Sequence, residues 1–394
     1  MRMSQLSRRY GVLVPLVLAL ACGGGSPPVV APAPSAESAP TPYVEPAPLP
    51  APMKPVYVPP MGASVERFVY YGTDRALTGD STAWSRYGIG QGELALGVVR
   101  VSLPTDRQAR ATGDLPPVPM LGVFRRAPNP ARDIYMQRTV PLARPLWVEQ
   151  VRRQVQLDSL KSILVYVHGF ANTYEDAVRR GAQLAYDLPF DGAMLIYSWP
   201  SRGEISPVAY FRDDKAVNGS QAPLKEFLEL VLAETGAERV HVLAHSMGTL
   251  LLSRTLKEMA DQYPGTRFDQ VVLAAPDIDT TAFRRTFAPA LQKVAHRVTV
   301  YASRYDKALD MAQTASSYPR VGQAGSAMIL LSGLDTIDAS SAGPAEFGHG
   351  YFSGSNAVLN DLRDLLLERP ASARRLQPRQ RGALTFWELL GGSR

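Results

Sequence analysis

Between residues 163 and 367, short apolar runs alternate regularly with longer amphipathic segments. The runs are rich in aliphatic and β-branched residues, as in ILVYV, AMLIYS and RVHVLA, and are typical of buried strands. The segments between them have the length and apolar spacing of helices. We therefore expect an α/β fold, with a doubly wound, mostly parallel sheet and helices on both faces. The expected strands are 163–167, 193–198, 239–244, 269–274, 297–302 and 327–331, and the expected helices are 172–187, 223–235, 247–263, 281–294, 307–315 and 356–367.

The preceding part of the chain is less regular. Residues 67–71, 93–102 and 134–142 predict strands, and residues 147–157 predict an amphipathic helix. No internal repeat of fixed period is present. We expect one folded domain over residues 61–368.

Residues 1–21 have the pattern of an export signal. Three arginines in the first nine residues precede an apolar stretch at 11–21, which is shorter than the roughly 20 residues that span a bilayer. The small-x-small pattern at 19–21 ends directly before Cys22, the only cysteine. This arrangement resembles a bacterial lipoprotein signal, in which that cysteine is acylated. Gly23 at the next position favours the outer membrane. The alternative is ordinary secretion with a free thiol at the new N-terminus.

The two ends of the chain differ in composition from the folded body. Proline makes up 13 of the 34 residues from 27 to 60. The segment 22–60 is therefore expected to be an extended, semi-rigid tether that begins at the lipid anchor. Residues 369–394 hold six arginines and one acid and are expected to form a basic, flexible tail.

The net charge of +6 belongs to these ends. The signal and the tail account for more than all of it and leave the rest of the chain near −2, so the folded body has no electrostatic case for binding nucleic acid. A single cysteine also excludes an intramolecular disulfide framework and a Cys-ligated zinc or iron–sulfur site.

The run AHSMG at 244–248 stands between an expected strand and an expected helix. It matches the nucleophile-elbow pattern G-x-S-x-G, with Ala in the first Gly position. Such a turn lifts the Ser246 hydroxyl out of the sheet and directs the N–H of Met247 toward a developing oxyanion. The alternative is a structural serine that caps the helix.

The run HGFAN at 168–172 follows the expected strand 163–167. A His-Gly pair at this place resembles the oxyanion loop of lipases and esterases, so the N–H of Phe170 is expected to be the second oxyanion donor. His168 would then shape the loop and would not be the base.

Of the five histidines, His349 is the candidate general base. It follows the last expected strand and precedes the last helix, where the chain order Ser…Asp…His puts the base. The other four have other expected places. His168 belongs to the oxyanion loop, and His241 lies inside a strand. His245 directly precedes the serine, and His296 precedes a strand at the edge of the sheet opposite the candidate site.

The acid that orients the base should follow a strand between the nucleophile and the base. Asp306, after the strand that ends at 302, is the preferred candidate, and Asp277, after the strand that ends at 274, is the alternative. Asp335 and Asp338 follow the last expected strand, where they can instead brace the loop of the base.

No metal and no cofactor are expected. His241 and His245 have the spacing of a zinc helix but lie on a strand, where four residues span about 13 Å, too far to share an ion. No Walker-type phosphate-binding run is present.

Several runs together resemble a bacterial family. They are VYVHGFANTYEDAVRRGAQLAYDL, LIYSWPSRG, VHVLAHSMGT, VVLAAPDIDTTAF, LDTID and GHGYF, with FVYYGTDRALTG upstream, and they extend over residues 66–367. The chain is similar to bacterial α/β-hydrolases described as esterase- or lipase-like, a domain of unknown function. The resemblance implies an α/β-hydrolase fold and a Ser–His–acid site at Ser246, His349 and Asp306, and it leaves the substrate open.

We expect a membrane-anchored hydrolase of carboxylic esters that works by two-step acyl transfer on a small-molecule or lipid ester. Residues 200–220, with Tyr210 and Phe211, are the candidate cap over the acyl group. Three alternatives stay open: a thioesterase, amidase or deacylase of envelope polymers; a non-catalytic envelope-binding module; and a membrane-surface adaptor acting through the basic tail with Phe386 and Trp387. The oligomeric state does not follow from the sequence.

Overall fold

The computed structural model describes residues 64–105, 120–121, 124–125, 127–263, 265, 268–342 and 349–391. All of them belong to one compact unit of the chain, Ala51–Arg394. The expected signal peptide, Cys22 and the tether lie outside the described residues.

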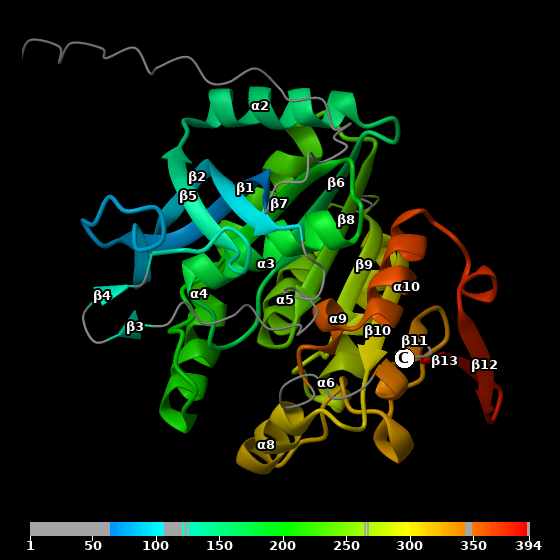
Figure 1. Cartoon of the computed structure of the whole chain (residues 1–394). Helices are drawn as coiled ribbons and strands as arrows, with labels where there is room; N and C mark the ends of the chain where they lie inside the picture. The colour runs from blue at the N-terminus through cyan, green and yellow to red at the C-terminus, as the bar shows by residue number, and fades with distance from the viewer. Residues whose placement is uncertain are drawn as a thin grey trace, which may run out of the picture. The chain divides into compact units, whose positions relative to one another are not determined.

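Eleven strands of the described residues form a single sheet in the order β12-β13-β11-β10-β9-β8-β6-β7-β1-β2-β5 (Figure 1). From β13 to β1 all neighbours are parallel, and antiparallel pairs flank them at both edges. The strands are β1 (Ser64–Leu77), β2 (Tyr87–Pro104), β5 (Tyr135–Pro141), β6 (Ser162–Val167), β7 (Ala193–Ser198), β8 (Arg239–His245), β9 (Phe268–Ala274), β10 (Ala295–Ala302), β11 (Asp335–Asp338), β12 (Leu376–Arg381) and β13 (Leu384–Leu389), with a separate pair, β3 (Met120–Leu121) and β4 (Phe124–Arg125).

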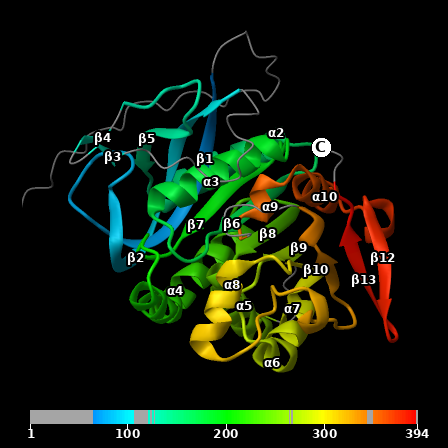
Figure 2. The same cartoon turned by 60° about the horizontal axis from the view of Figure 1, so that its bottom comes forward.

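Helices cover both faces of the sheet, as the alternation predicts. One core joins the sheet to α2, α4, α5 and α7, and a second core joins it to α3, α9 and α10. Figure 2 shows α3, α9 and α10 on one side of the strands and α4, α5 and α7 on the other. The helices are α2 (Arg144–Leu157), α3 (Tyr174–Asp187), α4 (Pro207–Glu234), α5 (Met247–Gln262), α6 (Thr280–Ala282), α7 (Ala288–Val294), α8 (Lys307–Ser316), α9 (Tyr351–Gly354) and α10 (Asn356–Leu366), with short helical turns at Phe283–Phe287, Gly325–Ala327, Ser340–Ala342 and Ala371–Ala373.

The central strands are buried on both faces. All six residues of β6 are buried, with Ile163, Val165 and Val167 in the first core and Leu164 and Tyr166 in the second. This two-sided burial explains why such strands are continuous apolar runs without polar alternation.

The chain reverses its direction across the sheet at β6. It passes from β6 to β7 on one side and then returns to place β8 on the other side of β6. Open α/β sheets bind ligands at such a switch point, beyond the carboxyl ends of the strands. The loops that follow β6 and β8 are the two that carry the predicted oxyanion loop and nucleophile.

The strand expected at 327–331 is wrong. The strand at this place in the sheet is β11, the LDTID segment, which pairs with β10 and β13. Met328 and Leu330 are buried instead in a small cluster against Leu384 and Phe386 of the C-terminal hairpin. Their apolar character therefore reflects burial without strand pairing.

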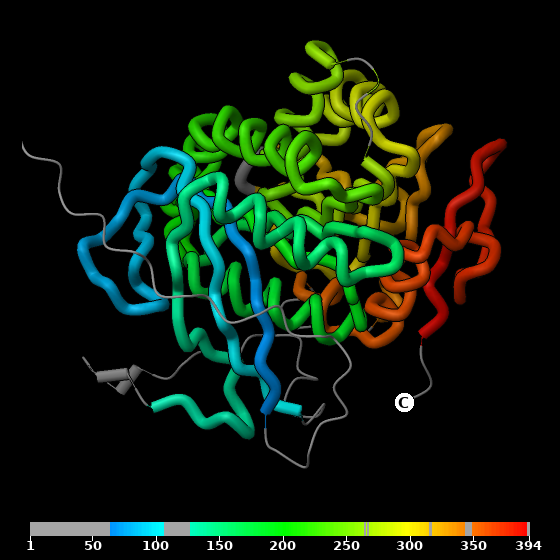
Figure 3. The backbone as a smooth tube through the Cα atoms, turned by 90° about the horizontal axis from the view of Figure 1, so that it is seen from above, coloured from blue at the N-terminus to red at the C-terminus, as the bar shows by residue number. Residues whose placement is uncertain are grey.

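The tail expected to be flexible is also a structured part of the domain. Residues 376–389 form the β12–β13 hairpin, and β13 adds to the sheet beside β11. Figure 3 shows this red hairpin at the edge of the sheet far from blue β1 and β2. The exposed side chains of β12 account for its polar sequence, while Leu376 and Leu389 are buried. The basic composition of this segment is therefore typical of an exposed strand at the edge of the sheet.

Helix α4 begins 16 residues before the predicted start at Pro223. Ser206 caps it by accepting the Ala209 N–H, and Pro207 occupies the first turn. Pro223 lies inside this helix, although proline is more common in the first turn, where Pro207 stands. The first turns of α4 supply the residues expected to form the cap.

Candidate active site

Ser246 occupies a strained turn between β8 and α5. Its backbone angles are φ 52° and ψ −128°, and its N–H donates to the Ala274 carbonyl (3.0 Å). Its side chain makes no capping hydrogen bond to α5, so a simple helix-capping role does not account for it. A non-glycine residue in this backbone region costs about 1–3 kcal/mol, which is typical of functional turns.

Two glycines allow the loop after β6 to approach this turn closely. A Cβ on Gly248 would lie 2.2 Å from the His168 carbonyl oxygen, and a Cβ on Gly169 would lie 2.7 Å from the Ser246 Cβ. The pattern of small residues around the serine is therefore a packing requirement between the two loops. The same contact brings the predicted oxyanion loop beside the predicted nucleophile.

His349 is hydrogen-bonded to Asp306, the preferred acid. The Nδ1 atom of His349 lies 2.8 and 2.9 Å from the two carboxylate oxygens of Asp306. Burial alone would lower the pKa of His349, but the Asp306 carboxylate and its hydrogen bond raise that pKa above its ordinary value. His349 and Ser246 line the same cavity.

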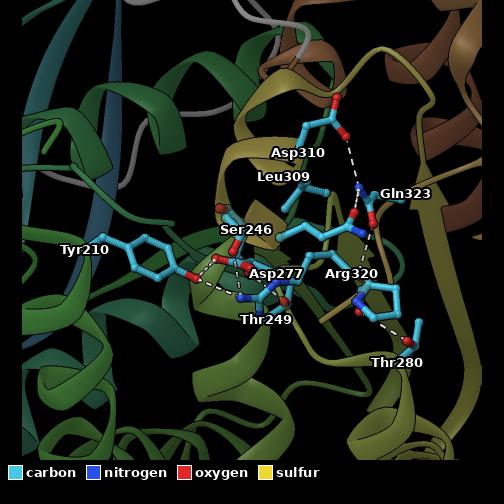
Figure 4. A network of polar contacts seen from close by, with 12 residues as sticks. Tyr210, Ser246, Thr249, Asp277, Thr280, Leu309, Asp310, Arg320 and Gln323 are labelled. Carbon is cyan, nitrogen blue, oxygen red and sulfur yellow. Dashed lines mark hydrogen bonds and ion pairs between the residues drawn. The ribbon is translucent and has the colours of Figure 1, made fainter. Parts of the chain in front are cut away.

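Asp277, the alternative acid, is engaged elsewhere. Its Oδ2 accepts a hydrogen bond from the Tyr210 hydroxyl (2.9 Å), and its Oδ1 lies 3.3 Å from Nε of the buried Arg320 (Figure 4). Asp277 also lines the cavity, and burial raises its pKa. Asp306 thus contacts the imidazole of His349, whereas Asp277 links Tyr210 of α4 to Arg320.

Among the described residues, the two later aspartates contact groups other than His349, and residues 343–348 of the loop before His349 lie outside the described part of the chain. Asp338 ends β11, accepts the Ser340 N–H (2.9 Å) and pairs with Arg304 (3.4 Å). Asp335 begins the same strand and lies 3.7 Å from Nε of Arg297.

His245 has a contact that the sequence did not suggest. Its ring stacks on Phe352 with centroids 4.4 Å apart, and its Nε2 lies 3.1 Å from the His349 carbonyl oxygen. His245 therefore contacts both the backbone of the candidate base and the helix α9 that follows it. The sequence signal that could have indicated this role is its position directly before the nucleophile, at the end of the central strand β8.

The buried histidines other than His349 are neutral. Burial lowers the pKa of His168 to about 3 and that of His241 to about 4, and it lowers the pKa of His245 well below its ordinary value. A neutral imidazole suits a structural hydrogen-bonding role. His296 lies at the start of β10 and is exposed.

The cavity beside Ser246 has a volume of about 650 Å³. Its walls are mainly apolar, with Phe170 from the oxyanion loop, Tyr210 and Phe211 from α4, and Leu309 and Met311 from α8. This size and lining are typical of a small-molecule site. The segment expected to act as a cap thus contributes directly to the wall.

Within the described ranges, no group of three or more His, Cys, Asp and Glu side chains is arranged to hold a metal ion. None of the described helices combines the length and the apolar character needed to cross a membrane.

Comparison with known proteins agrees with this architecture. The sequence profile of the family described as "Alpha/beta hydrolase of unknown function (DUF900)" matches residues 147–369. No curated protein matches the sequence.

Similar solved structures include a "putative cell surface hydrolase" from Lactobacillus plantarum WCFS1 (10% identity, 54% of this chain and 94% of that chain, TM-score 0.33). A second is a "predicted CIB-like hydrolase" from Thermoplasma acidophilum (14% identity, 54% of this chain and 89% of that chain, TM-score 0.31). A third is an arylesterase (12% identity, 52% of this chain and 76% of that chain, TM-score 0.27). Likeness at this level says nothing of substrate or location. The family match covers more than half of the chain, which therefore belongs to the α/β-hydrolases of unknown function (DUF900).

Proposed function

We propose that this α/β-hydrolase cleaves carboxylic esters through an acyl-enzyme formed on Ser246. The observation that carries the proposal is the hydrogen bond between His349 and Asp306, in a cavity that Ser246 also lines. A serine on a strained elbow, a histidine oriented by a buried carboxylate and a loop in contact with the elbow are the parts that acyl transfer needs.

In the first step, the Ser246 Oγ bonds to the ester carbonyl carbon while His349 Nε2 takes the hydroxyl proton. The carbonyl oxygen becomes an oxyanion and accepts hydrogen bonds from the N–H groups of Phe170 and Met247. Collapse of this intermediate expels the alcohol, which takes the proton from His349. Asp306 stays ionised and stabilises the imidazolium.

In the second step, water attacks the acyl-enzyme with His349 again as base. The same two N–H groups stabilise the second oxyanion. The ester bond to Ser246 then breaks, the serine recovers its proton from His349, and the carboxylic acid leaves.

The cavity wall supports an ester with an apolar acyl or alkyl part. Ile205, Phe211 and Met311 line the cavity, and each is more than half exposed at its mouth. A mainly apolar cavity wall that includes exposed side chains suits a hydrocarbon chain, because burying each CH₂ stabilises the complex by about 0.8 kcal/mol. A small-molecule or lipid ester is therefore the proposed substrate class.

The same proposal includes a lipid anchor at Cys22 and a place in the cell envelope, with the outer membrane favoured. Its support is the sequence alone: an export signal that ends at the only cysteine, followed by a proline-rich tether. Release of Cys22→Ser protein from the membrane fraction, together with loss of the acyl mass from the N-terminal peptide, would support it. Wild-type protein whose N-terminal peptide carries no acyl group would contradict it.

The test of the reaction class is labelling of the full chain in detergent with a fluorophosphonate probe. The probe traps an activated serine, because the Oγ bonds to phosphorus and fluoride leaves. We expect labelling of wild type and none of Ser246→Ala or His349→Ala. Ser253→Ala is a matched control, since Ser253 is a buried serine of α5 in the first turns after the elbow.

A series of p-nitrophenyl esters from acetate to laurate, beside matched thioesters and anilides, then identifies the bond that is cleaved. Faster turnover of the longer esters supports the proposal. Preference for the thioester or anilide would favour the other acyl-transfer chemistries. Folded wild type that is not labelled and cleaves none of these compounds would favour a non-catalytic binding module.

A further inference from the structure

Arg75 lies on β1, outside the residues that the family profile matches, yet its buried guanidinium contacts the loops of the candidate site. Its Nη2 donates to the Asn172 carbonyl (2.8 Å) and its Nη1 to the Ser201 carbonyl (2.9 Å). Its Nε donates to Ser198 Oγ (2.9 Å), and Nη1 also reaches the Gly88 carbonyl (3.1 Å). Burying a guanidinium costs free energy unless hydrogen-bond acceptors surround it, and here four acceptors do so.

A buried carboxylate holds the same loop from the other side. Asp213 of α4 accepts hydrogen bonds from Ser201 Oγ (2.5 Å), the Arg202 N–H (3.1 Å) and the Ala171 N–H. Ser201 Oγ in turn accepts the Asn172 N–H (3.1 Å). The loop 168–172 is thus held between opposite charges supplied by β1 and α4.

The position of Arg75 also determines which nitrogen of His168 carries the proton. Arg75 Nη2 lies 3.4 Å from His168 Nε2, and Ser198 Oγ lies 3.2 Å from the same atom. Because a guanidinium only donates, Nε2 is the acceptor and the proton is on Nδ1. Nδ1 then donates to the Gly169 carbonyl (2.9 Å). Burial and the charge of Arg75 lower the pKa of His168 to about 3, so the ring stays neutral.

The Gly169–Phe170 peptide unit links this histidine to the chemistry. In a trans peptide the C=O and N–H groups point in opposite directions. The bond from His168 to the Gly169 oxygen therefore sets the direction of the Phe170 N–H. The next peptide is fixed as well, because Asn172 Nδ2 donates to the Phe170 carbonyl (2.7 Å).

We propose that Arg75 is a positioning residue for the oxyanion hole. By holding His168 as its Nδ1–H tautomer and the loop at Asn172, it directs the Phe170 N–H toward the oxyanion. This inference rests on the proposed function, since it concerns the transition state of acyl transfer. It also gives β1 a part in the reaction.

The test uses the full chain in detergent and compares Arg75→Lys with wild type. Lysine keeps the charge but loses the planar fork that reaches several acceptors at once. With p-nitrophenyl butyrate we expect kcat to fall about 10–100-fold, because one oxyanion donor contributes about 10²–10³ and would be misdirected but not removed. KM should change by less than about threefold. The affinity for an alkylboronic acid, which forms a tetrahedral adduct on Ser246, should fall by the same factor as kcat/KM.

Arg374→Lys is the matched control. Arg374 is equally buried and paired with Asp361 (3.3 Å), but it lies in the segment between α10 and the C-terminal hairpin. Its replacement should lower the melting temperature and leave kcat and boronate affinity unchanged.

Nuclear magnetic resonance of ¹⁵N-histidine-labelled protein reads the tautomer without any reaction. In wild type His168 should be neutral with its proton on Nδ1, and Arg75→Lys should change that signal while Arg374→Lys should not. His168→Phe identifies the signal and removes the bond to the Gly169 oxygen. It should lower kcat by a similar factor, which keeps the proposal testable if Arg75→Lys does not fold.

Two results would overturn the inference while leaving the proposed function intact. One is a folded Arg75→Lys or His168→Phe protein with wild-type kcat and boronate affinity. The other is a His168 proton on Nε2 in active wild type. Wild type that hydrolyses no ester and binds no boronate would contradict the proposed function itself, and the role of Arg75 with it.

Discussion

Asp306 has two contacts that are both set by its place at the end of β10. Its Oδ1 accepts the Leu309 N–H (3.1 Å) and so caps α8, while both oxygens face His349 Nδ1. The helix cap fixes the carboxylate, and the fixed carboxylate orients the imidazole. The side chain is buried, so water does not compete for these contacts.

Asp306→Asn should therefore lower kcat by about 10³–10⁴-fold with the fold intact, because an amide can still cap α8 but favours the wrong imidazole tautomer. Asp277→Asn should lower kcat by less than about tenfold, because Asp277 contacts Tyr210 and Arg320. Steady-state kinetics of the two variants distinguishes the acids. A larger loss for Asp277→Asn would reverse the assignment.

The pH dependence of activity depends on His349. The base must be neutral to accept the serine proton, so activity should rise with pH through the pKa of His349. That pKa is raised, so half-maximal kcat/KM is expected above the ordinary histidine value of about 6.5. In Asp306→Asn the carboxylate contribution is gone and burial remains, which lowers the pKa, so the midpoint should shift to lower pH. A pH–rate profile with a midpoint well below 6.5 in wild type would contradict this.

At the scale of elements, the site depends on two adjacent parallel strands, β6 and β8, that end side by side. Their register pairs Val167 with Ala244, so the next residues of each strand enter the two loops of the candidate site together. The chain order of β6, β7 and β8 and their order in the sheet differ, and this difference opens the switch point. The loops can then touch only because Gly248 and Gly169 have no side chain.

Gly248→Ala tests this packing. The added methyl would meet the His168 carbonyl, and backbone can yield only by moving the oxyanion loop. We expect a loss of about 1–3 kcal/mol in the free energy of unfolding and a fall in kcat. Gly79→Ala is a control for replacing glycine, because a Cβ at Gly79 meets nothing within 4 Å; its positive φ adds strain without affecting the site. Unchanged stability and turnover in Gly248→Ala would contradict the close approach.

At the scale of the whole domain, the sheet extends beyond the region that the family profile covers at both ends. β1 and β2 add to one edge beside β7, and the β12–β13 hairpin adds to the other beside β11. The segment that leads from α10 into the hairpin also holds the buried Arg374, which pairs with Asp361 of α10. The C-terminal segment is thus part of the same sheet and core.

Deletion of residues 369–394 should destabilise the domain. It removes the buried Leu376 and Leu389, each of which contributes about 1.5–3 kcal/mol, and leaves the edge of β11 unpaired. We expect the melting temperature to fall by roughly 5 °C or more in a thermal scan. An unchanged melting temperature would show that the hairpin only rests on the domain.

The sequence by itself determined the fold class and the chain order of the candidate site, because these depend on local signals. Apolar runs buried on both faces, a serine between small residues at a strand–helix junction and a late histidine are all readable from neighbouring residues. The same order admitted both Asp306, the preferred acid, and Asp277, the alternative. The contact that separates the two, between residues 43 positions apart, is visible only in the structure.

Only the tertiary structure decided the features that depend on distant pairing. Met328 and Leu330 are as apolar as a strand but pack without pairing. The polar β12 is a strand because β13, which itself pairs with β11, offers it an edge. Arg75 is separated by about 90 residues or more from the loops it contacts, and the run FVYYGTDRALTG in which it lies does not indicate those contacts. Burial and hydrogen bonding join residues that the sequence keeps apart, and only the folded sheet brings them together.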